Sequence, residues 1–163
     1  MKKAFLGILI LLFSVSLVMA DHVSISASAF SGHYQGEGYS RDSYGRYIGK
    51  TISPGYLQAQ VSLPDGCKIK KIRLNCVDNS DNGFITVTLV RMNHFTGSYS
   101  NLFATSSFGA TSSSNMQWFV DSTCSPPAHR QVQNGPVTWN LYLFFTEAGT
   151  DLWVYSVQIE YTW

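Results

Sequence analysis

The stretch Val61–Met92 reads VSLPDGCKIKKIRLNCVDNSDNGFITVTLVRM and decides the fold class. It contains two runs, Lys68–Val77 and Phe84–Met92, in which apolar and polar side chains alternate. Alternation with a period of two is typical of β-strands that bury one face. The polar connector between the runs ends in Asn82-Gly83, a pair that readily adopts the positive φ angles of a tight turn. The two runs are therefore predicted to form an antiparallel hairpin.

The rest of the chain extends this pattern. Further alternating segments are Tyr56–Leu63, Met116–Val120, Thr138–Phe145 and Leu152–Trp163, and no segment after residue 20 has the period of a helix. Turn-forming Gly, Pro, Asn and Ser residues separate them, so the sequence predicts an all-β, antiparallel β-sandwich of jelly-roll type with about six to eight strands. The last strand is expected at the centre of its sheet. Its predicted core side comprises Trp153, Tyr155, Val157, Ile159, Tyr161 and Trp163.

Residues 1–20 have the features of a secretory signal peptide. Lys2 and Lys3 precede the apolar run Phe5–Val18, and Val18-Met19-Ala20 supplies short side chains at the cleavage position. The mature chain is then expected to be one domain, residues 21–163, with an N-terminal strand (21–30), a Gly/Tyr-rich loop (31–56) and a core region (57–163). The predicted location is secreted or extracellular, with the periplasm or the cell surface as possible sites.

The charge distribution argues against a nucleic-acid partner and against an anionic membrane surface. Without Lys2 and Lys3, nine basic and ten acidic residues remain, and Lys68, Lys70 and Lys71 form the one basic group. A nucleic-acid-binding domain needs a basic patch or stripe. We therefore expect no nucleic-acid partner, and the apolar run is too short for a comfortable membrane span, so the chain is not predicted to be membrane-embedded.

Export permits disulfides, and the chain has three cysteines. Cys67 and Cys76 lie about 30 Å apart along one predicted strand, so they cannot bond to each other. Cys76 shares the parity of Ile72 and Leu74, which predicts a buried thiol. We therefore expect a Cys67–Cys124 bridge with Cys76 free.

The N-terminal segment has an apolar face made of Val23, Ile25, Ala27 and Ala29, alternating with serines after Val23. One interpretation is an edge strand of the protein's own sheet. The other is an assembly strand that completes the sheet of a neighbouring molecule.

Exposed tyrosines are the candidate ligand-binding residues. The Gly/Tyr-rich loop has no periodicity, and long loops in compact domains are usually functional or packed over the surface. Its Tyr34, Tyr39, Tyr44 and Tyr47 either bind a ligand or cover one end of the core. Tyr142 and Tyr56 are also expected to be exposed. A tyrosine ring offers a flat apolar face with a polar tip, which suits glycan or surface binding.

Catalytic and metal-binding motifs are missing from the sequence. The four histidines have no ligand spacing, no Gly-x-Ser-x-Gly is present, and the carboxylates are dispersed. Asp78-x-Ser80-x-Asn82-Gly83 resembles the start of an EF-hand loop, but Leu89 stands where the bidentate Glu is needed. We expect no enzymatic activity, no cofactor and no metal site, and a tight turn at residues 78–83.

Several of these segments resemble an exported, uncharacterised bacterial domain. The pattern comprises V-x-L-P-D-G (Val61–Gly66), a D-N turn (Asp78-Asn79) and Y-x-V-x-I-x-Y (Tyr155–Tyr161). The resemblance covers residues 56–163, and more loosely 27–30. It implies a small secreted β-sandwich and no reaction, so no catalytic residue is carried over.

The function predicted from the sequence is therefore extracellular binding, attachment or assembly without catalysis. The partner would be a glycan, a protein surface or other copies of the chain. One alternative is a filament or surface-layer subunit that donates its N-terminal strand. Another is a small outer-membrane β-barrel, suggested by the aromatic closing strand, although few runs reach the ~9–11 residues that a spanning strand needs.

Overall fold

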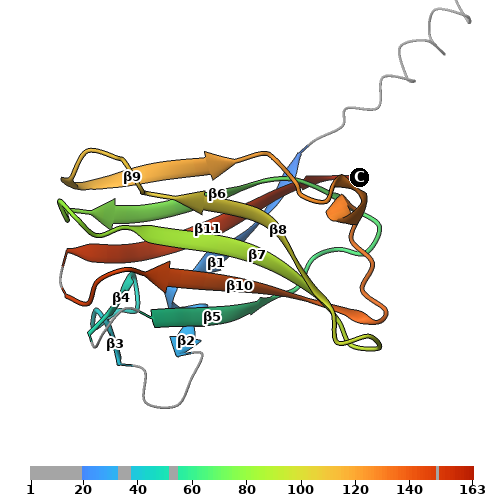
Figure 1. Cartoon of the computed structure of the whole chain (residues 1–163), viewed down its shortest axis with the longest axis horizontal. Coiled ribbons are helices and arrows are strands. Elements are labelled where there is room, and N and C mark those ends of the chain that lie inside the picture. The colour runs from blue at the N-terminus through green and yellow to red at the C-terminus, as the bar shows by residue number, and fades with distance from the viewer. Residues whose placement is uncertain (1–19, 33–37, 52–54, 150) are drawn as a thin grey trace, which may run out of the picture.

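A computed structural model of the chain describes residues 20–32, 38–51, 55–149 and 151–163. In this part of the chain eleven strands form two antiparallel sheets that pack face to face (Figure 1). The predicted all-β sandwich is confirmed. Two separate sheets contradict the alternative of a small β-barrel, in which a single sheet closes on itself. The predicted signal peptide lies outside the described residues apart from Ala20.

The front sheet, nearest the viewer in Figure 1, has the strand order β2-β5-β10-β7-β8. Its strands are β2 (Ser31–Gly32), β5 (Gly55–Val61), β10 (Val137–Phe145), β7 (Ile85–Asn93) and β8 (Tyr99–Ser106). All of its neighbouring pairs are antiparallel.

The back sheet has the order β3-β4-β11-β6-β9, and β1 also pairs with β11. Its strands are β1 (Asp21–Ser26), β3 (Tyr39–Arg41), β4 (Ile48–Lys50), β6 (Lys68–Asp78), β9 (Ser113–Asp121) and β11 (Leu152–Thr162). Strand β11 lies between β6 on one side and β1 and β4 on the other, which confirms the predicted central position of the last strand.

The core lies between the sheets and is built from alternate positions of their strands. On β10 the inward residues Trp139, Leu141, Leu143 and Phe145 are all buried, as the alternation predicts. Each large apolar side chain removed from water in this way contributes roughly 1.5–3 kcal/mol. Burial of one face of each sheet is therefore the main force that holds the sandwich together.

The helical segments of the described chain are two short 3-10 turns, η1 (Ala27–Ala29) and η2 (Pro127–Arg130). The first carries the chain from β1 in the back sheet to β2 in the front sheet, and the fully buried Phe30 follows it. The second lies in the connection from β9 to β10. No helix among the described residues has the length and apolar character needed to cross a bilayer.

The predicted hairpin of Lys68–Val77 with Phe84–Met92 is wrong. These runs are β6 and β7, and they lie in opposite sheets. Strand β6 pairs with β11 and β9, whereas β7 pairs with β10 and β8. Alternation shows that each strand buries one face, but it does not identify the neighbouring strand.

The connector between β6 and β7 is held to the neighbouring connector between β10 and β11. Ser80 Oγ donates to Glu147 Oε2 at 2.8 Å and accepts the Gly83 N–H at 2.7 Å. The Asn79 N–H donates to the Asp151 carbonyl, and the Phe84 N–H to Thr146 Oγ1. The expected tight turn therefore exists, but it directs the chain from one sheet to the other.

A β-bulge changes the side-chain parity of β11. The register with β6 shifts between Val154 and Ser156, so one extra residue enters the strand there. Val157, Ile159 and Tyr161 face the core as predicted. Trp153 precedes the bulge and Tyr155 lies within it, and both face outward. The extra residue reverses the inward–outward alternation of the side chains on the two sides of the bulge. Trp163 lies beyond the strand and is exposed.

Strand β1 belongs to the protein's own sheet. Asp21–Ser26 pairs with β11 from Asp21↔Tyr161 to Ser26↔Ser156. The edge-strand interpretation is confirmed for Val23 and Ile25, while Ala27 and Ala29 are in η1 and extend no strand. The segment is already paired within its chain, so the structure gives no support to its role as an assembly strand.

Replacing Ile25 with Ala tests this pairing. Ile25 belongs to the buried core cluster, so the substitution is expected to lower the free energy of unfolding by about 2–4 kcal/mol. Urea denaturation measures the loss, and Ser24→Ala, on the exposed side of the same strand, is the matched control. An unchanged unfolding midpoint for Ile25→Ala would show that β1 does not pack on this core.

Candidate functional site

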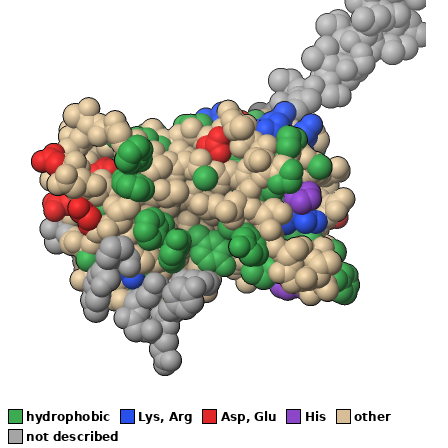
Figure 2. All heavy atoms as spheres, viewed as in Figure 1, with side chains coloured by type: hydrophobic (Ala, Val, Ile, Leu, Met, Phe, Trp, Pro, Cys, Tyr) green, Lys and Arg blue, Asp and Glu red, His purple; other side chains and the backbone are tan. Residues whose placement is uncertain are grey.

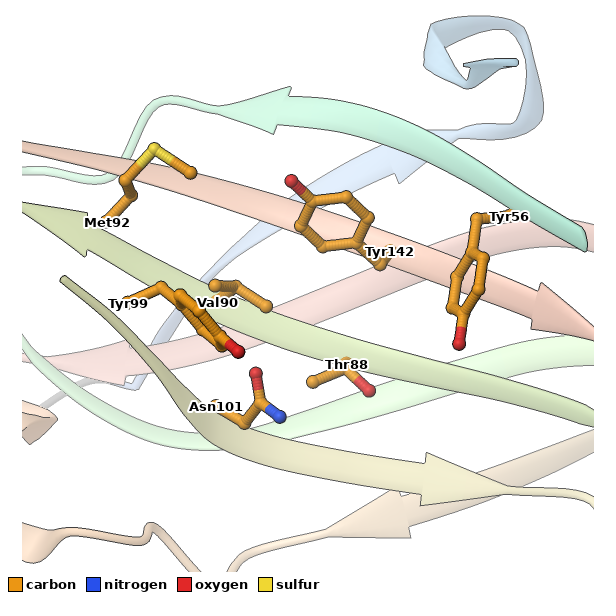
Figure 3. A pocket seen from close by; sticks show the side chains of 7 residues that line it. All are labelled: Tyr56, Thr88, Val90, Met92, Tyr99, Asn101 and Tyr142. Carbon is orange, nitrogen blue, oxygen red and sulfur yellow. The ribbon is translucent and has the colours of Figure 1, made fainter. Parts of the chain in front are cut away.

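The outer face of the front sheet has a hollow of about 520 Å³, which we call the front groove (Figure 3). Four neighbouring strands supply its lining: β5, β10, β7 and β8. Its lining residues are Tyr56, Thr88, Val90, Met92, Tyr99, Asn101 and Tyr142. The volume falls within the range of small-molecule sites, roughly 300–1,000 Å³.

Side-chain size explains the hollow. The inner strand β7 presents the short side chains Thr88 and Val90 at the floor. Tyrosines stand around them, with Tyr142 beside Tyr56 on one side and Tyr99 on the other (Figure 3). Tyr56 is 43% exposed and Tyr99 is 71% exposed, so their rings are accessible from solvent.

The strand register brings these residues together from distant parts of the sequence. Tyr142 on β10 is opposite Thr88 on β7, and Met92 on β7 is opposite Tyr99 on β8. Residues directly opposite on one sheet face have Cβ atoms about 4.5–5.5 Å apart. The groove is therefore fixed by the hydrogen-bonded framework of the sheet.

A second β-bulge aims the β8 residues into the groove. The β7–β8 register shifts between Leu89 and Val90, so that Phe103 is opposite Leu89 but Asn101 is opposite Val90. Leu102 and Phe103 are therefore both buried, although they are adjacent in the chain. The extra residue keeps Asn101 and Tyr99 on the outer face, an effect that bulges often have near functional sites.

Among the described residues that line the groove there is no Asp, Glu, Lys, Arg or His side chain. Its polar groups are tyrosine and threonine hydroxyls and the Asn101 amide, and its apolar surface comes from aromatic rings, Val90 and Met92. Such a surface can stack on a flat apolar ligand face and exchange hydrogen bonds with neutral hydroxyl groups. It offers neither a pair of carboxylates for acid–base chemistry nor charge for binding an ion.

Further surface features flank the front groove at both of its ends along the strands. A second hollow of about 250 Å³ includes Gln60 and Thr138, and Thr138 is opposite Met92 of the front groove. At the other end Tyr56 packs on Phe144 with ring centroids 4.8 Å apart. Figure 2 shows hydrophobic side chains in a row across this face, with acidic side chains gathered mainly at its left end. The surface therefore suits an elongated, uncharged ligand.

Of the tyrosines predicted from the Gly/Tyr-rich loop, Tyr39, Tyr44 and Tyr47 do not line the groove. Tyr34 lies outside the described residues. Tyr39 and Tyr44 lie in the segment of β3 and the turn that leads to β4, where Tyr44 is 81% exposed. Tyr47 packs edge-on against Trp153, with ring centroids 4.7 Å apart. The ligand-binding role of all four tyrosines stays a prediction, and the structure puts Tyr39, Tyr44 and Tyr47 at the back sheet.

This loop contains the short strands β2, β3 and β4, which the sequence does not predict. Gly49 explains part of their placement. A Cβ atom there would lie 2.8 Å from the Leu152 carbonyl oxygen and from the Trp153 ring, so only glycine permits this approach of β4 to β11.

The predicted Cys67–Cys124 bridge is not present in the structure. Cys67, Cys76 and Cys124 are three buried free thiols. The Cys124 Sγ donates to the Pro126 carbonyl at 3.5 Å, and Cys67 belongs to the apolar core cluster. The thiols are thus accommodated by burial and hydrogen bonding, and the predicted burial of Cys76 is confirmed.

Burial of Cys76 gives a pH-dependent stability. Desolvation, followed by the nearby Asp78 carboxylate, raises the pKa of this thiol from 9.0 to about 12. The unfolded chain loses this proton first as the pH rises, so the free energy of unfolding is expected to fall between pH 9 and 12. Urea unfolding at several pH values measures the slope, which Cys76→Ala should reduce. Equal slopes for the two proteins would contradict the assignment.

A metal site has no support in the part of the chain that the structure covers. There, no three His, Cys, Asp or Glu side chains are grouped so that they could hold an ion. In the EF-hand-like segment, Asp78 Oδ1 accepts the Ser80 N–H, and Ser80 Oγ accepts the Asn82 N–H. These oxygen atoms form the turn itself.

No protein family and no curated protein matches the sequence. The fold, however, is similar to that of solved carbohydrate-binding modules. One is the C-terminal CBM6 of a marine laminarinase from Zobellia galactanivorans (15% identity, 85% of this chain and 98% of that chain, TM-score 0.51). A second is a family 6 module from Clostridium cellulolyticum in complex with xylose (15% identity, 83% and 94%, TM-score 0.51). A third is the xylan-binding module CBM15 (9% identity, 88% and 96%, TM-score 0.55). The chain therefore has the jelly-roll β-sandwich fold of these modules.

Proposed function

We propose that this protein is a non-catalytic module that binds a neutral polysaccharide in the front groove, outside the cytoplasm. The observation that carries the proposal is the groove's lining: three tyrosines around a floor of short side chains, with no Asp, Glu, Lys, Arg or His among the described lining residues. Sugar rings have apolar faces and a rim of hydroxyl groups. Aromatic stacking and neutral hydrogen bonds are the interactions that match them.

The elongated shape supports a chain rather than a single sugar. On β10 the outer-face positions extend from Thr138 to Phe144, which are six residues apart. A strand rises about 3.4 Å per residue, so this distance is about 20 Å. Several sugar rings fit over that length. The groove is open, so the ligand does not have to be an end of a polysaccharide.

Two structures with this fold support the choice of ligand. The Clostridium cellulolyticum module has been solved with xylose, and the CBM15 module binds xylan. The proposal for this chain depends on its own groove, because the sequence identity to these modules is at most 15%.

Native affinity electrophoresis tests the proposed function. The mature chain is run through gels that contain xylan, a β-1,3-glucan or an anionic polysaccharide. We expect slower migration with at least one neutral polysaccharide, and no effect of salt, since no charged contact is involved. Unchanged migration in every neutral gel, or retardation only by the anionic polymer and lost in salt, would contradict the proposal.

A further inference from the structure

The outer face of the back sheet, opposite the front groove, presents an apolar stripe. Met116, Trp118 and Val120 alternate along β9, and all three are exposed. Gln117 and Phe119 point the other way, and Phe119 packs against the core. The Trp118 ring is 48% exposed, which is high for the largest apolar side chain.

A buried side-chain oxygen that has no hydrogen-bond partner among the described residues lies beside this stripe. Asn75 on β6 is opposite Trp118 on β9 and opposite Ser156 on β11, so it shares their outer face. It is only 7% exposed, and its Oδ1 has no hydrogen-bond partner among the described residues. Buried acceptors are nearly always paired in proteins, so this covered atom would gain a hydrogen bond if a ligand displaced the side chains over it and supplied a donor.

The neighbouring outward-facing residue on β6 also has a buried polar atom without a partner among the described residues. Arg73 is opposite Val120, and its Nε is also buried without a partner in the described part of the chain. Its Nη2 donates to Glu160 Oε2 at 3.4 Å, and Lys71 Nζ lies 2.9 Å from the same oxygen. The carboxylate thus offsets part of the positive charge, which makes a strongly anionic ligand a poor match.

These features select the occupant. A second copy of the chain pairing with the edge of β9 would use backbone groups, and would leave Asn75 Oδ1 and Arg73 Nε unpaired. A saccharide supplies both a flat apolar face for the Trp118 ring and hydroxyl groups that donate to Asn75 and accept from Arg73.

We propose that Trp118, Asn75 and Arg73 form a second saccharide site on the back sheet, which makes the protein bivalent. This site is separate from the front groove, because it lies on the opposite sheet. A bivalent module can hold two polysaccharide chains together or bind one surface with increased avidity.

The test uses a variant whose front groove is disabled, Tyr99→Ala/Tyr142→Ala. Xylohexaose and a β-1,3-glucan hexasaccharide are titrated into the wild type and this variant, and the four tryptophan indole N–H resonances are followed by NMR. We expect the Trp118 resonance to shift in both proteins. Trp118→Ala in the disabled background should weaken the remaining binding about tenfold, which corresponds to 1.4 kcal/mol.

Asn75→Leu gives an independent readout. The substitution removes an unpaired buried acceptor and keeps a similar shape, so the unfolding midpoint in urea should rise while saccharide binding weakens. A lower midpoint would show that Asn75 is needed by the fold, and would overturn its assignment as a ligand contact.

Other outcomes distinguish the two sites. Front-groove binding with a static Trp118 resonance would overturn the second site and leave the proposed function intact. Trp118 shifts without any effect of Tyr99→Ala/Tyr142→Ala on affinity would support the second site and contradict the front groove. A concentration-dependent dimer in sedimentation that Trp118→Lys abolishes would assign the stripe to a second copy. No binding of either probe to either protein would overturn both.

Discussion

Replacing Tyr142 with Ala is expected to weaken binding of a neutral polysaccharide at the front groove by about 30-fold. Tyr142 projects from the inner strand β10 and lies between Tyr56 and Met92 in the lining (Figure 3). Aromatic residues at the centre of a binding surface commonly contribute about 2 kcal/mol, which is the 30-fold effect. Calorimetric titration in the Trp118→Ala background, where the second site is disabled, measures it.

The matched control is Tyr44→Ala. Tyr44 is exposed whereas Tyr142 is half-buried, but Tyr44 lies in the turn between β3 and β4 and does not line the groove. The same substitution there should leave the affinity unchanged. If Tyr44→Ala weakens binding and Tyr142→Ala does not, the ligand binds to the Gly/Tyr-rich loop and the front groove is the wrong site.

Replacing Trp139 with Ala is expected to produce the largest loss of stability, about 3–5 kcal/mol. The Trp139 side chain is buried in the core, and its Nε1 donates to Asn134 Oδ1 at 3.1 Å. Asn134 in turn bonds Asp65 and the Leu63 carbonyl, so it connects the loops at this end of the sandwich. The substitution leaves a large cavity and an amide oxygen without its donor.

Urea denaturation measures this loss, and two further variants separate its causes. Trp139→Phe keeps most of the volume but removes the N–H donor, so its cost should be smaller than that of Trp139→Ala. Trp163→Ala removes an exposed tryptophan and should change stability by less than about 0.5 kcal/mol. Equal effects of Trp139→Ala and Trp163→Ala would mean that Trp139 does not fill this core.

The sequence predicts which face of most strands is buried, but it does not predict which strands are neighbours. On β10 the apolar residues 139, 141, 143 and 145 alternate without interruption, and all are buried. The same pattern in β6 and β7 is compatible with a hairpin and with a crossover between sheets. The crossover is accompanied by a hydrogen bond between Ser80 and Glu147, which are 67 positions apart. The local sequence around either residue does not predict this bond.

Bulges account for the other differences. The extra residue near Tyr155 leaves Trp153 facing outward, against the predicted parity. The extra residue at Leu102–Phe103 interrupts the alternation of β8, so its buried face cannot be recognised in the sequence. Two of the seven lining residues can be found from the sequence, because Tyr142 has the outward parity of β10 and Tyr56 is expected to be exposed. Tyr99 and Asn101 could not, since their orientation depends on a bulge that only the pairing with β7 defines.

The position of a bound saccharide tests the central claim most directly. In a crystal structure of the mature chain with xylohexaose or a β-1,3-glucan hexasaccharide, a sugar ring is expected over Tyr142, with further rings along the strands toward Tyr99 and Tyr56. A saccharide bound only to the β3–β4 segment, around Tyr39 and Tyr44, with the front groove empty, would contradict the account.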